Sequence, residues 1–294
     1  MAFKNLGKRT VTGILLAAAF IMVLFLPKLV SWGGGVVLSV CAFAVLTAGG
    51  EIYRILCTHE SRPRAFLRSA CWLFAPLATF VFCFLTFVLG EERSPLFGAE
   101  IIPLSIWASF TLLLALRFVR TSGEVSHLLK PLAEDLLAFT VLSVCGSCLI
   151  ALSFWRGDTL ALLWLVASVA SNDIAAYFGG SILGGPKLAE AISPGKTVAG
   201  GVVGGLAGTL CGFVFGLLLF PEVSILEIAV LSIMIALSAP VGDLVKSVLK
   251  RVYGVKDTGA LFPGHGGVLD RIDGVLFGAV PAYFFIISLF GAGV

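Results

Sequence analysis

Nine long apolar runs divide this sequence, and they constrain its fold more than any other feature. A helix needs roughly 20 residues to cross a hydrocarbon core of about 30 Å. The runs have about that length and lie at residues 11–27, 30–50, 69–90, 99–119, 133–154, 159–181, 198–220, 225–249 and 272–290. In addition, only 13% of the residues are charged, against about a quarter in soluble domains. We therefore predict an all-α polytopic membrane protein with about nine transmembrane helices.

The basic residues indicate how these helices are oriented. If the N-terminus is cytoplasmic, every Lys and Arg except Lys28, Arg93 and Arg156 falls in or beside a cytoplasmic loop. Because Lys and Arg collect on the cytoplasmic side of membrane proteins, we predict a cytoplasmic N-terminus and a C-terminus outside. No cleavage pattern ends the first run, so we expect it to remain as an anchor.

The two halves of the chain differ in the charges that their apolar runs carry. Residues 1–155 hold about five runs with almost no ionisable groups, and we predict that they form an N-terminal transmembrane scaffold. There we interpret Glu51, and the arginines of the loop after it, as interfacial residues. Residues 156–294 hold about four runs, and we predict that they form the catalytic region, with cytoplasmic loops at 182–197 and 250–271.

Two aspartates of the second half lie inside apolar runs. Asp173 belongs to the run 159–181 and Asp243 to the run 225–249, each several residues from the inner end. A charge in the membrane costs at least about 2.5–3.5 kcal/mol, so such residues usually face a polar cavity or a partner. We therefore expect both to lie in a functional site.

Small residues in the spans have a packing interpretation. The run 198–220 carries glycine at every fourth position, at residues 200, 204, 208, 212 and 216. This stripe predicts close contact with a neighbouring helix. The seven cysteines have no spacing typical of a zinc site or a disulfide framework, and we expect the pair Cys145 and Cys148 to pack between helices.

Acidic residues at the inner ends of the last two runs predict a metal site. Four polar residues at helical spacing share one face of the run 225–249: Asp243, Lys246, Ser247 and Lys250. Asp270 and Asp273 share a face at the start of the last run, where the positive end of the helix favours anions. Carboxylate oxygens with no His or Cys cluster suit Mg²⁺. We predict that acids from these two helix ends converge to hold it; the sequence leaves a second cation open.

Basic and small residues surround these acids. The last cytoplasmic loop and its flanks contribute four cations with the chemistry of phosphate binding, Lys250, Arg251, Lys256 and Arg271. Glycines at 264, 266 and 267 allow backbone amides to approach an anion. Between them, His265 has two interpretations, contact with a phosphate or base and a turn histidine bonded to backbone.

The loop after the run 159–181 adds a second basic and hydroxyl cluster. Ser193, Lys196 and Thr197 are predicted to bind a substrate phosphate. The sequence Gly-Lys-Thr does not make this a P-loop, because Glu190 stands where that motif needs glycine and no strand is expected before it. Carboxylates, a metal and cations together indicate phosphoryl or nucleotidyl transfer.

These residues resemble the signature of the phosphatidate cytidylyltransferases, also called CDP-diacylglycerol synthases. The matching positions are Ser247, Lys250, Arg251, Lys256, Asp257, Gly259, Pro263, Gly264, His265, Gly266, Gly267, Asp270, Arg271 and Asp273, with Gly242, Asp243, Ser193, Lys196 and Thr197 upstream. The resemblance covers about residues 170–280. The sequence departs from the family at Gly195 and Ala199, where a lysine and an acidic residue are usual.

The resemblance implies transfer of the cytidylyl group of CTP to phosphatidic acid, giving CDP-diacylglycerol and pyrophosphate. It also implies a Mg²⁺ requirement, a homodimer, and a place in the inner membrane with the active site facing the cytoplasm. In that pattern Asp243 and Asp270 correspond to the acids of the metal centre, and Lys250 and Arg271 are expected to assist catalysis. Ser193, Lys196, Thr197, Ser247, Arg251, Lys256, Asp257, His265, Asp173 and Asp273 are expected to bind substrates.

Two alternatives remain open on the residues alone. Acids inside the membrane and glycine-broken helices are also typical of ion-coupled secondary transporters. Against this, the charges gather at one side of the membrane instead of its midplane. The other alternative is a CTP-dependent enzyme that acts on another lipid. The net charge of +3 is too small to indicate nucleic acid as a partner.

Overall fold

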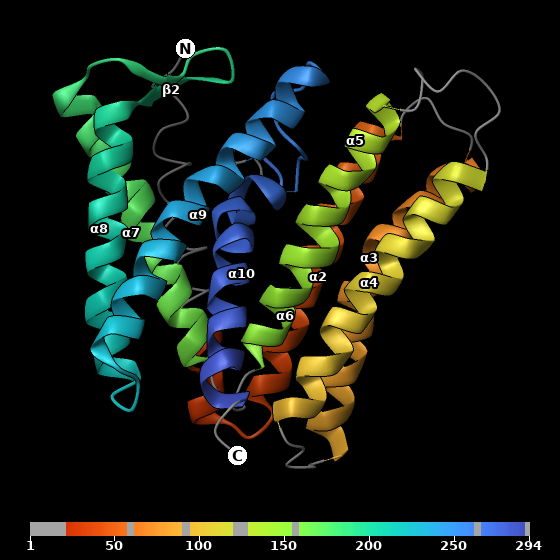
Figure 1. Ribbon diagram of the computed structural model, residues 1–294, viewed down its shortest axis with the longest axis horizontal. Coiled ribbons are helices and arrows are strands. Elements are labelled where there is room, and N and C mark those ends of the chain that lie inside the picture. The colour runs from red at the N-terminus through yellow and green to blue at the C-terminus, as the bar shows by residue number, and fades with distance from the viewer. Residues whose placement is uncertain are drawn as a thin grey trace.

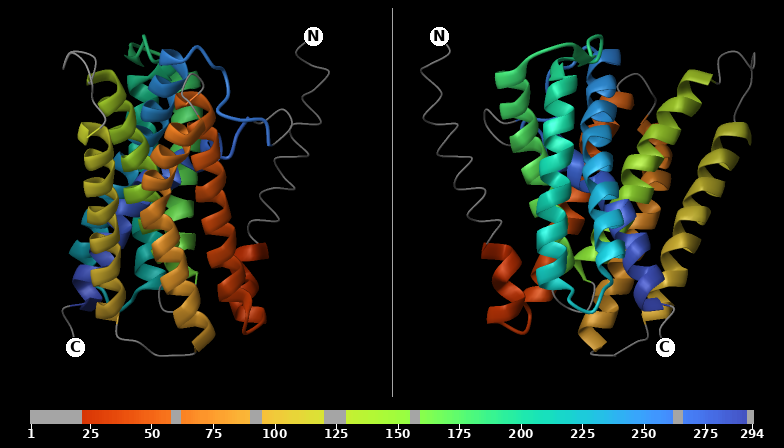
Figure 2. Two further views of the ribbon diagram at one scale, coloured as in Figure 1. Left: turned by 90° about the vertical axis from the view of Figure 1, so that its right-hand side faces the viewer. Right: turned by 60° about the vertical axis from the view of Figure 1, so that its left-hand side comes forward.

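The computed structural model describes residues 22–57, 62–89, 95–119, 129–154, 159–261 and 266–291. Within these ranges the chain is a bundle of helices that run side by side, with a short hairpin at one end (Figures 1 and 2). The elements are α2 (Gly33–Leu56), α3 (Arg62–Leu89), α4 (Pro95–Val119), α5 (Leu129–Ala138), the π-helix η3 (Phe139–Gly146), α6 (Ser147–Ser153), α7 (Leu160–Leu183), β1 (Lys187–Ala189), β2 (Ser193–Thr197), α8 (Val198–Leu219), α9 (Ile225–Val252) and α10 (Leu269–Gly291).

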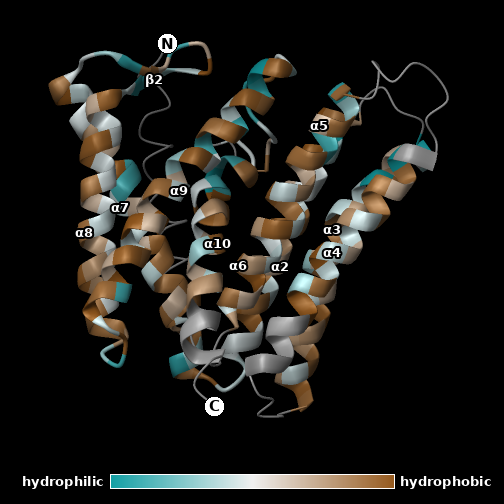
Figure 3. Cartoon of the chain, viewed as in Figure 1, coloured by the Kyte–Doolittle hydropathy of each residue, from teal (hydrophilic) through white to brown (hydrophobic). Residues whose placement is uncertain are grey.

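The helices confirm an all-α polytopic membrane protein in outline. Six helical spans in the described ranges are long and apolar enough to cross a membrane, and α4 adds a shorter apolar stretch, Ile101–Arg117. Hydrophobic residues cover most of the helix surfaces, and hydrophilic residues gather toward the end that carries the hairpin (Figure 3). The first predicted run, 11–27, lies mostly outside the described residues. The count of nine spans and the sides of the two termini therefore stay predictions.

The predicted loop 182–197 is more ordered than the sequence indicated. Its two strands pair antiparallel, with Lys187 opposite Thr197 and Ala189 opposite Ser193. After α7, Gly184 and Gly185 have φ values of 61° and 93°, which residues other than glycine rarely adopt. These two glycines turn the chain, and the hairpin returns it to the start of α8.

The glycine stripe of α8 packs closely against two helices, as predicted. All five glycines are buried. A Cβ atom added at Gly204 would lie 2.6 Å from Asn172 Oδ1 and 2.7 Å from Ala176 Cβ, both on α7. A Cβ added at Gly212 would lie 2.7 Å from Ser168 Oγ on α7 and 3.1 Å from Ser232 Cβ on α9. The glycines of the stripe thus allow α7 and α9 to pack closely against α8.

Helix α8 provides a matched pair of substitutions, one at a glycine of the stripe and one at the glycine that follows it. We expect Gly204→Ala to destabilise the protein by about 1–3 kcal/mol, because the added methyl group overlaps Asn172 and Ala176. Gly205 has no atom within 4 Å of an added Cβ, so we expect Gly205→Ala to be neutral or to stabilise by up to about 1 kcal/mol. Thermal unfolding of the detergent-solubilised protein, followed by circular dichroism, measures both. Equal melting temperatures for the two variants would contradict this packing.

A buried ionic cluster corrects the expectation that the first half has almost no ionisable groups in its spans. Asp135 of α5 is 1% exposed and accepts hydrogen bonds from Arg68 Nε of α3 at 2.9 Å and from Arg117 Nε of α4 at 2.8 Å. Tyr253, at the end of α9, donates a hydrogen bond to Glu134 of α5. Arg68 is therefore not a snorkelling residue, and the cluster connects α3, α4 and α5 with the end of α9.

The proposed division of the chain near residue 155 stays a prediction. Helix α10 packs against α9 and α7 of the second half and also against α6 and η3 of the first. Helix α10 is therefore positioned by helices from both halves.

Candidate functional site

A cleft of about 830 Å³ lies between α7, the hairpin, the start of α8, α9 and α10. Seven of the predicted site residues line it: Asp173, Ser193, Lys196, Thr197, Asp243, Asp270 and Asp273. Asn172, Tyr177, Ser181 and Lys187 line it as well, and the sequence did not single these out. Polar side chains from four separate segments thus face one cavity in an otherwise apolar bundle.

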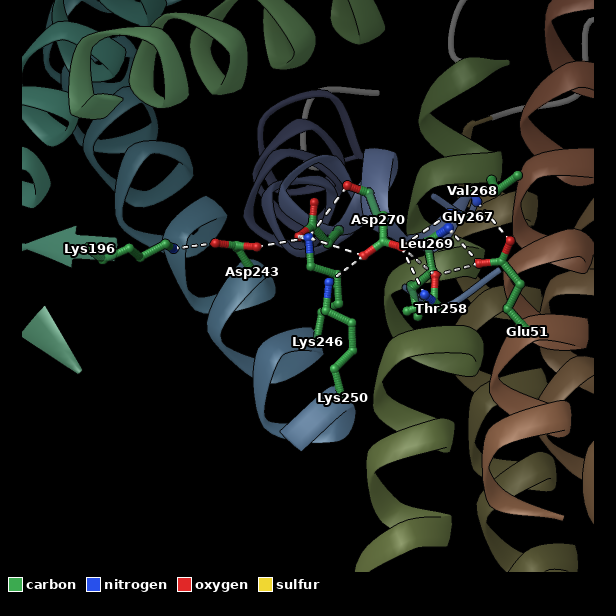
Figure 4. Close-up of polar contacts among 11 residues, drawn as sticks. Glu51, Lys196, Asp243, Lys246, Lys250, Thr258, Gly267, Val268, Leu269 and Asp270 are labelled. Carbon is green, nitrogen blue, oxygen red and sulfur yellow. Dashed lines mark hydrogen bonds and ion pairs between the residues drawn. The ribbon is translucent and has the colours of Figure 1, made fainter. Parts of the chain in front are cut away.

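Lys246 of α9 lies at the centre of the acids. Its ammonium nitrogen is 2.8 Å from Asp243 Oδ1 and 3.8 Å from Asp270 Oδ1 (Figure 4). The same nitrogen lies 2.6 Å from Asp273 Oδ2. The Lys246 side chain is only 10% exposed. The sequence placed Lys246 on the polar face of α9 but gave it no role. Lys246 lies among the acids because α10 packs beside α9. Spacing along the sequence does not show which helices are neighbours.

The hairpin brings a second lysine to Asp243. Lys196 Nζ of β2 lies 2.5 Å from Asp243 Oδ2 (Figure 4). The next residue, Thr197, is the N-cap of α8, where its hydroxyl accepts a hydrogen bond from Gly200 N at 3.1 Å. A capping residue fixes the start of its helix, so the cap also holds the preceding lysine toward α9.

Asp270 is held by the start of its own helix and by the preceding loop. Its Oδ2 accepts hydrogen bonds from Thr258 N at 2.9 Å and Gly267 N at 3.1 Å, and its Oδ1 lies 2.8 Å from Lys250 Nζ. Gly266, with φ of 80°, turns the chain just before this contact. The glycines of this turn were predicted to let backbone amides approach an anion. In the structure, the amide of Gly267 donates to the carboxylate of Asp270.

Glu51 of α2 is a member of the site that the sequence interpretation missed. It is 4% exposed, and its carboxylate accepts hydrogen bonds from Val268 N at 2.8 Å and Leu269 N at 3.0 Å. The Thr258 hydroxyl lies 2.8 Å from Glu51 Oε2 and 3.0 Å from Asp270 Oδ2, so it joins the two carboxylates (Figure 4). Glu51 is therefore not an interfacial residue: it caps α10 from another helix.

The other predicted residues that the structure describes do not line the cleft. Arg251 Nε donates a hydrogen bond to the carbonyl of Ile192 at 3.2 Å, which joins the end of α9 to the hairpin. Ser247 is half-buried on α9, whereas Lys256, Asp257 and Arg271 are exposed. His265 lies outside the described residues. The roles predicted for these residues, in catalysis for Arg271 and in substrate binding for the others, stay predictions.

The acids of the cleft fit the hard, all-oxygen donor set that Mg²⁺ prefers. Asp243 Oδ1 and Asp270 Oδ1 both lie near Lys246 Nζ, at 2.8 and 3.8 Å, so the two carboxylates face the same part of the site. Among the described residues, no group of three or more His, Cys, Asp and Glu side chains is arranged to hold a metal ion. The usual Mg²⁺ site has one or two carboxylates and is completed by substrate phosphates and water.

Helices of this length and a cleft lined by aspartates and lysines define a polytopic membrane protein whose site has the side-chain chemistry of nucleotidyl transfer. The chain belongs to the cytidylyltransferase family, whose model matches residues 7–289.

Several bacterial phosphatidate cytidylyltransferases are similar to this chain. The protein of Brucella suis biovar 1 is 42% identical over 144 residues, which are 48% of this chain and 53% of the relative. The protein of Helicobacter pylori strain J99 is 43% identical over 121 residues, 41% of this chain and 45% of the relative. That of Bacillus subtilis strain 168 is 40% identical over 120 residues, 41% and 44% of the two chains. The chain thus spans about half the length of the curated relatives that it matches.

Proposed function

We propose that the protein transfers the cytidylyl group of CTP to phosphatidic acid, giving CDP-diacylglycerol and pyrophosphate for membrane phospholipid biosynthesis. The observation that carries this proposal is the interlocked set of Lys196, Lys246 and Lys250 with Asp243 and Asp270 beside a cleft of about 830 Å³. Family membership and the names of the similar proteins support it. The same membership argues against an ion-coupled transporter.

The surroundings of the cleft suit a lipid substrate whose phosphate meets a water-soluble nucleotide. Tyr177, which lines the cleft, and Phe178 and Ile182 near it on α7 are exposed apolar side chains. In a bilayer they would contact acyl chains, while Lys196 and Asp243 would face the headgroup. We place the protein in the inner membrane with this cleft toward the cytoplasm, because basic residues gather at the end of the helix bundle that carries the cleft. The homodimer remains part of this proposal.

The lysines would neutralise charge in the reaction. The phosphate of phosphatidic acid attacks the α-phosphorus of CTP: a new P–O bond forms, the bond to the β-phosphate oxygen breaks, and pyrophosphate leaves with that electron pair. Repulsion between anions is the main obstacle, and fixed cations reduce it. The side chains of Lys196 and Lys250 are 28% and 22% exposed. They are the ones that we expect to turn from their aspartates to substrate phosphates.

This exchange of partners would leave Asp243 and Asp270 able to hold Mg²⁺, which would supply Lewis-acid stabilisation of the phosphoryl oxygens. Asp173 would bound the lipid side of the cleft. Arg251, Lys256 and Arg271 would bind the triphosphate or the lipid phosphate from the loop side, together with Ser247, Asp257, His265 and Asp273 in the roles that the family pattern implies.

An assay of the purified protein in detergent tests this function. With CTP, Mg²⁺ and phosphatidate, we expect CDP-diacylglycerol and pyrophosphate in equal amounts, and no product when phosphatidate is left out or EDTA is added. Formation of CDP and a phosphorylated lipid would indicate a CTP-dependent lipid kinase instead. Turnover only with another lipid phosphate would contradict the substrate. No turnover, together with ion flux in proteoliposomes, would support a transporter.

A further inference from the structure

The proline inside α9 leaves one backbone carbonyl without its usual hydrogen bond. In an α-helix each carbonyl accepts from the N–H group four residues later, and proline has no N–H group. Pro240 lies inside α9, so the carbonyl that loses its donor is that of Ala236, a buried residue. A buried carbonyl without a donor is unfavourable, above all in a membrane, so we expect another group to replace the missing one.

A side chain of α7 supplies the replacement. Asn172 Nδ2 donates a hydrogen bond to the carbonyl of Ala236 at 2.6 Å. Because a carbonyl oxygen can only accept, the NH₂ group of the amide is the part that faces it. Asn172 is buried, and it lies against the glycine stripe of α8. A Cβ atom added at Gly208 would lie 2.9 Å from Asn172 Cβ and 3.4 Å from Ala236 Cβ. The stripe therefore leaves the space through which Asn172 reaches α9.

The same arrangement occurs a second time, away from the cleft. Pro76 lies inside α3, and the carbonyl four residues before it is that of Trp72. Ser143 of η3 is buried and donates a hydrogen bond to this carbonyl at 2.7 Å. In both helices, a polar side chain of a neighbouring helix thus replaces the donor that proline removes.

The segment of α9 after Pro240 forms one wall of the cleft. It carries Asp243 and Lys246, which line the cleft. It also includes Gly242, where an added Cβ would overlap the backbone carbonyl of Asp273 on α10. This close contact leaves little room for the segment to change its direction. A helix that lacks one hydrogen bond bends most easily at its proline. The wall of the cleft therefore depends on the hydrogen bond that replaces the missing one.

We propose that Asn172 is a positioning residue: it supplies the hydrogen-bond donor that Pro240 removes from α9, and it thereby fixes the direction of the helix segment that walls the cleft. Asn172 acts through α9 and not on a substrate. The expected effect on turnover rests on the proposed function, whereas the expected effect on stability does not.

A double-mutant cycle with Asn172→Ala and Pro240→Ala tests this inference. Pro240→Ala restores an N–H group for the carbonyl of Ala236, so Asn172 becomes dispensable. In the wild-type background, we expect Asn172→Ala to lower the melting temperature of the chain in detergent by about 2–5 °C. At a temperature where the variants are folded, it should lower CDP-diacylglycerol formation by about fivefold. In the Pro240→Ala background, the same change should lower the melting temperature by less than about half as much and activity by less than about twofold.

Ser143→Ala and Pro76→Ala form the matched control cycle. Their melting temperatures should show the same coupling, because the replaced hydrogen bond is of the same kind. Ser143→Ala should nevertheless keep near wild-type activity at a temperature where it is folded, because no residue of α3 or η3 lines the cleft. A loss of activity as large as that of Asn172→Ala would show that lost stability alone lowers turnover, and this would contradict a positioning role.

Equal losses from Asn172→Ala in the two backgrounds would also overturn the inference, because Asn172 would then act independently of Pro240. A measurement on the wild-type protein decides the matter if Pro240→Ala fails to fold. Asn5 and Asn172 are the only asparagines of the sequence, so nuclear magnetic resonance with ¹⁵N-labelled asparagine can follow the side-chain amide of Asn172. We expect its protons to exchange with water much more slowly than those of free asparagine. Equally fast exchange would mean that the hydrogen bond to α9 is absent.

The stability and exchange measurements need no turnover. Coupled melting temperatures and a protected Asn172 amide, in a protein that forms no CDP-diacylglycerol, would contradict the proposed function alone.

Discussion

Asp243→Asn is expected to lower the rate of CDP-diacylglycerol formation by about 10³-fold or more, with little change in the fold. Asparagine has nearly the same shape as aspartate, but it has no charge to hold a metal ion or to position the ammonium groups of Lys196 and Lys246. These lie 2.5 and 2.8 Å from the carboxylate in the wild-type protein. The measurement is product formation from CTP in detergent micelles. Circular dichroism and gel filtration report whether the variant folds.

Glu190→Gln is the control for this prediction. Glu190 is exposed in the turn between β1 and β2, so it is close in sequence to Lys196 but does not line the cleft. It removes one negative charge from the same end of the molecule and should keep near wild-type activity. If Asp243→Asn kept more than about a tenth of the activity, Asp243 would not be a metal ligand, since losing a ligand has a larger effect.

The helices could be predicted from the sequence because the bilayer imposes a length on each of them. The expected span 198–220 is Val198–Leu219 in the structure, and the expected span 159–181 is Leu160–Leu183. The glycine stripe of α8 was equally readable, because a repeat of four residues stays on one side of a helix. Both features depend on local spacing alone.

The convergence of the acids was only half predictable. Helical spacing placed Asp243 and Lys246 on one face of α9, and Asp270 and Asp273 on one face of α10. Which side chains meet depends on how closely the two helices approach. Gly242 decides this, because an added Cβ there would overlap the backbone carbonyl of Asp273. The glycine beside Asp243 was the signal, but its partner helix is not visible in a single sequence.

The charges of the first half were misinterpreted for a related reason. Arg68 and Glu51 lie near the ends of apolar runs, where interfacial residues are common. Their partners lie far along the chain: Arg68 pairs with Asp135, and Glu51 with the backbone of Val268 and Leu269. Residue spacing predicts only which side chains are neighbours on one helix. It cannot predict contacts between residues that are 67 or more than 200 positions apart in the sequence.

The second large effect is expected from Glu51→Ala. This change removes the acceptor for the backbone amides of Val268 and Leu269 at a buried position, and one of the two carboxylates near the hydroxyl of Thr258. A buried donor without an acceptor costs about 1–3 kcal/mol. We therefore expect a loss of several kcal/mol in stability and a fall in activity of at least about tenfold. Gly50→Ala is the control, since an added Cβ there meets no atom within 4 Å.

Glu51→Gln separates positioning from stability. Glutamine keeps one acceptor oxygen, so the loss of stability should be smaller than for Glu51→Ala. However, the amides of Val268 and Leu269 donate to different oxygens of the carboxylate, so the NH₂ group of glutamine would face one of these two donors. The loop that carries Thr258 and Gly267 should then hold Asp270 less well, because these two residues donate to its carboxylate at 2.9–3.1 Å. At a temperature where the variant is folded, we expect a higher Mg²⁺ concentration for half-maximal activity. An unchanged Mg²⁺ dependence would limit Glu51 to a role in stability, because among the described residues the Thr258 hydroxyl connects Glu51 with Asp270.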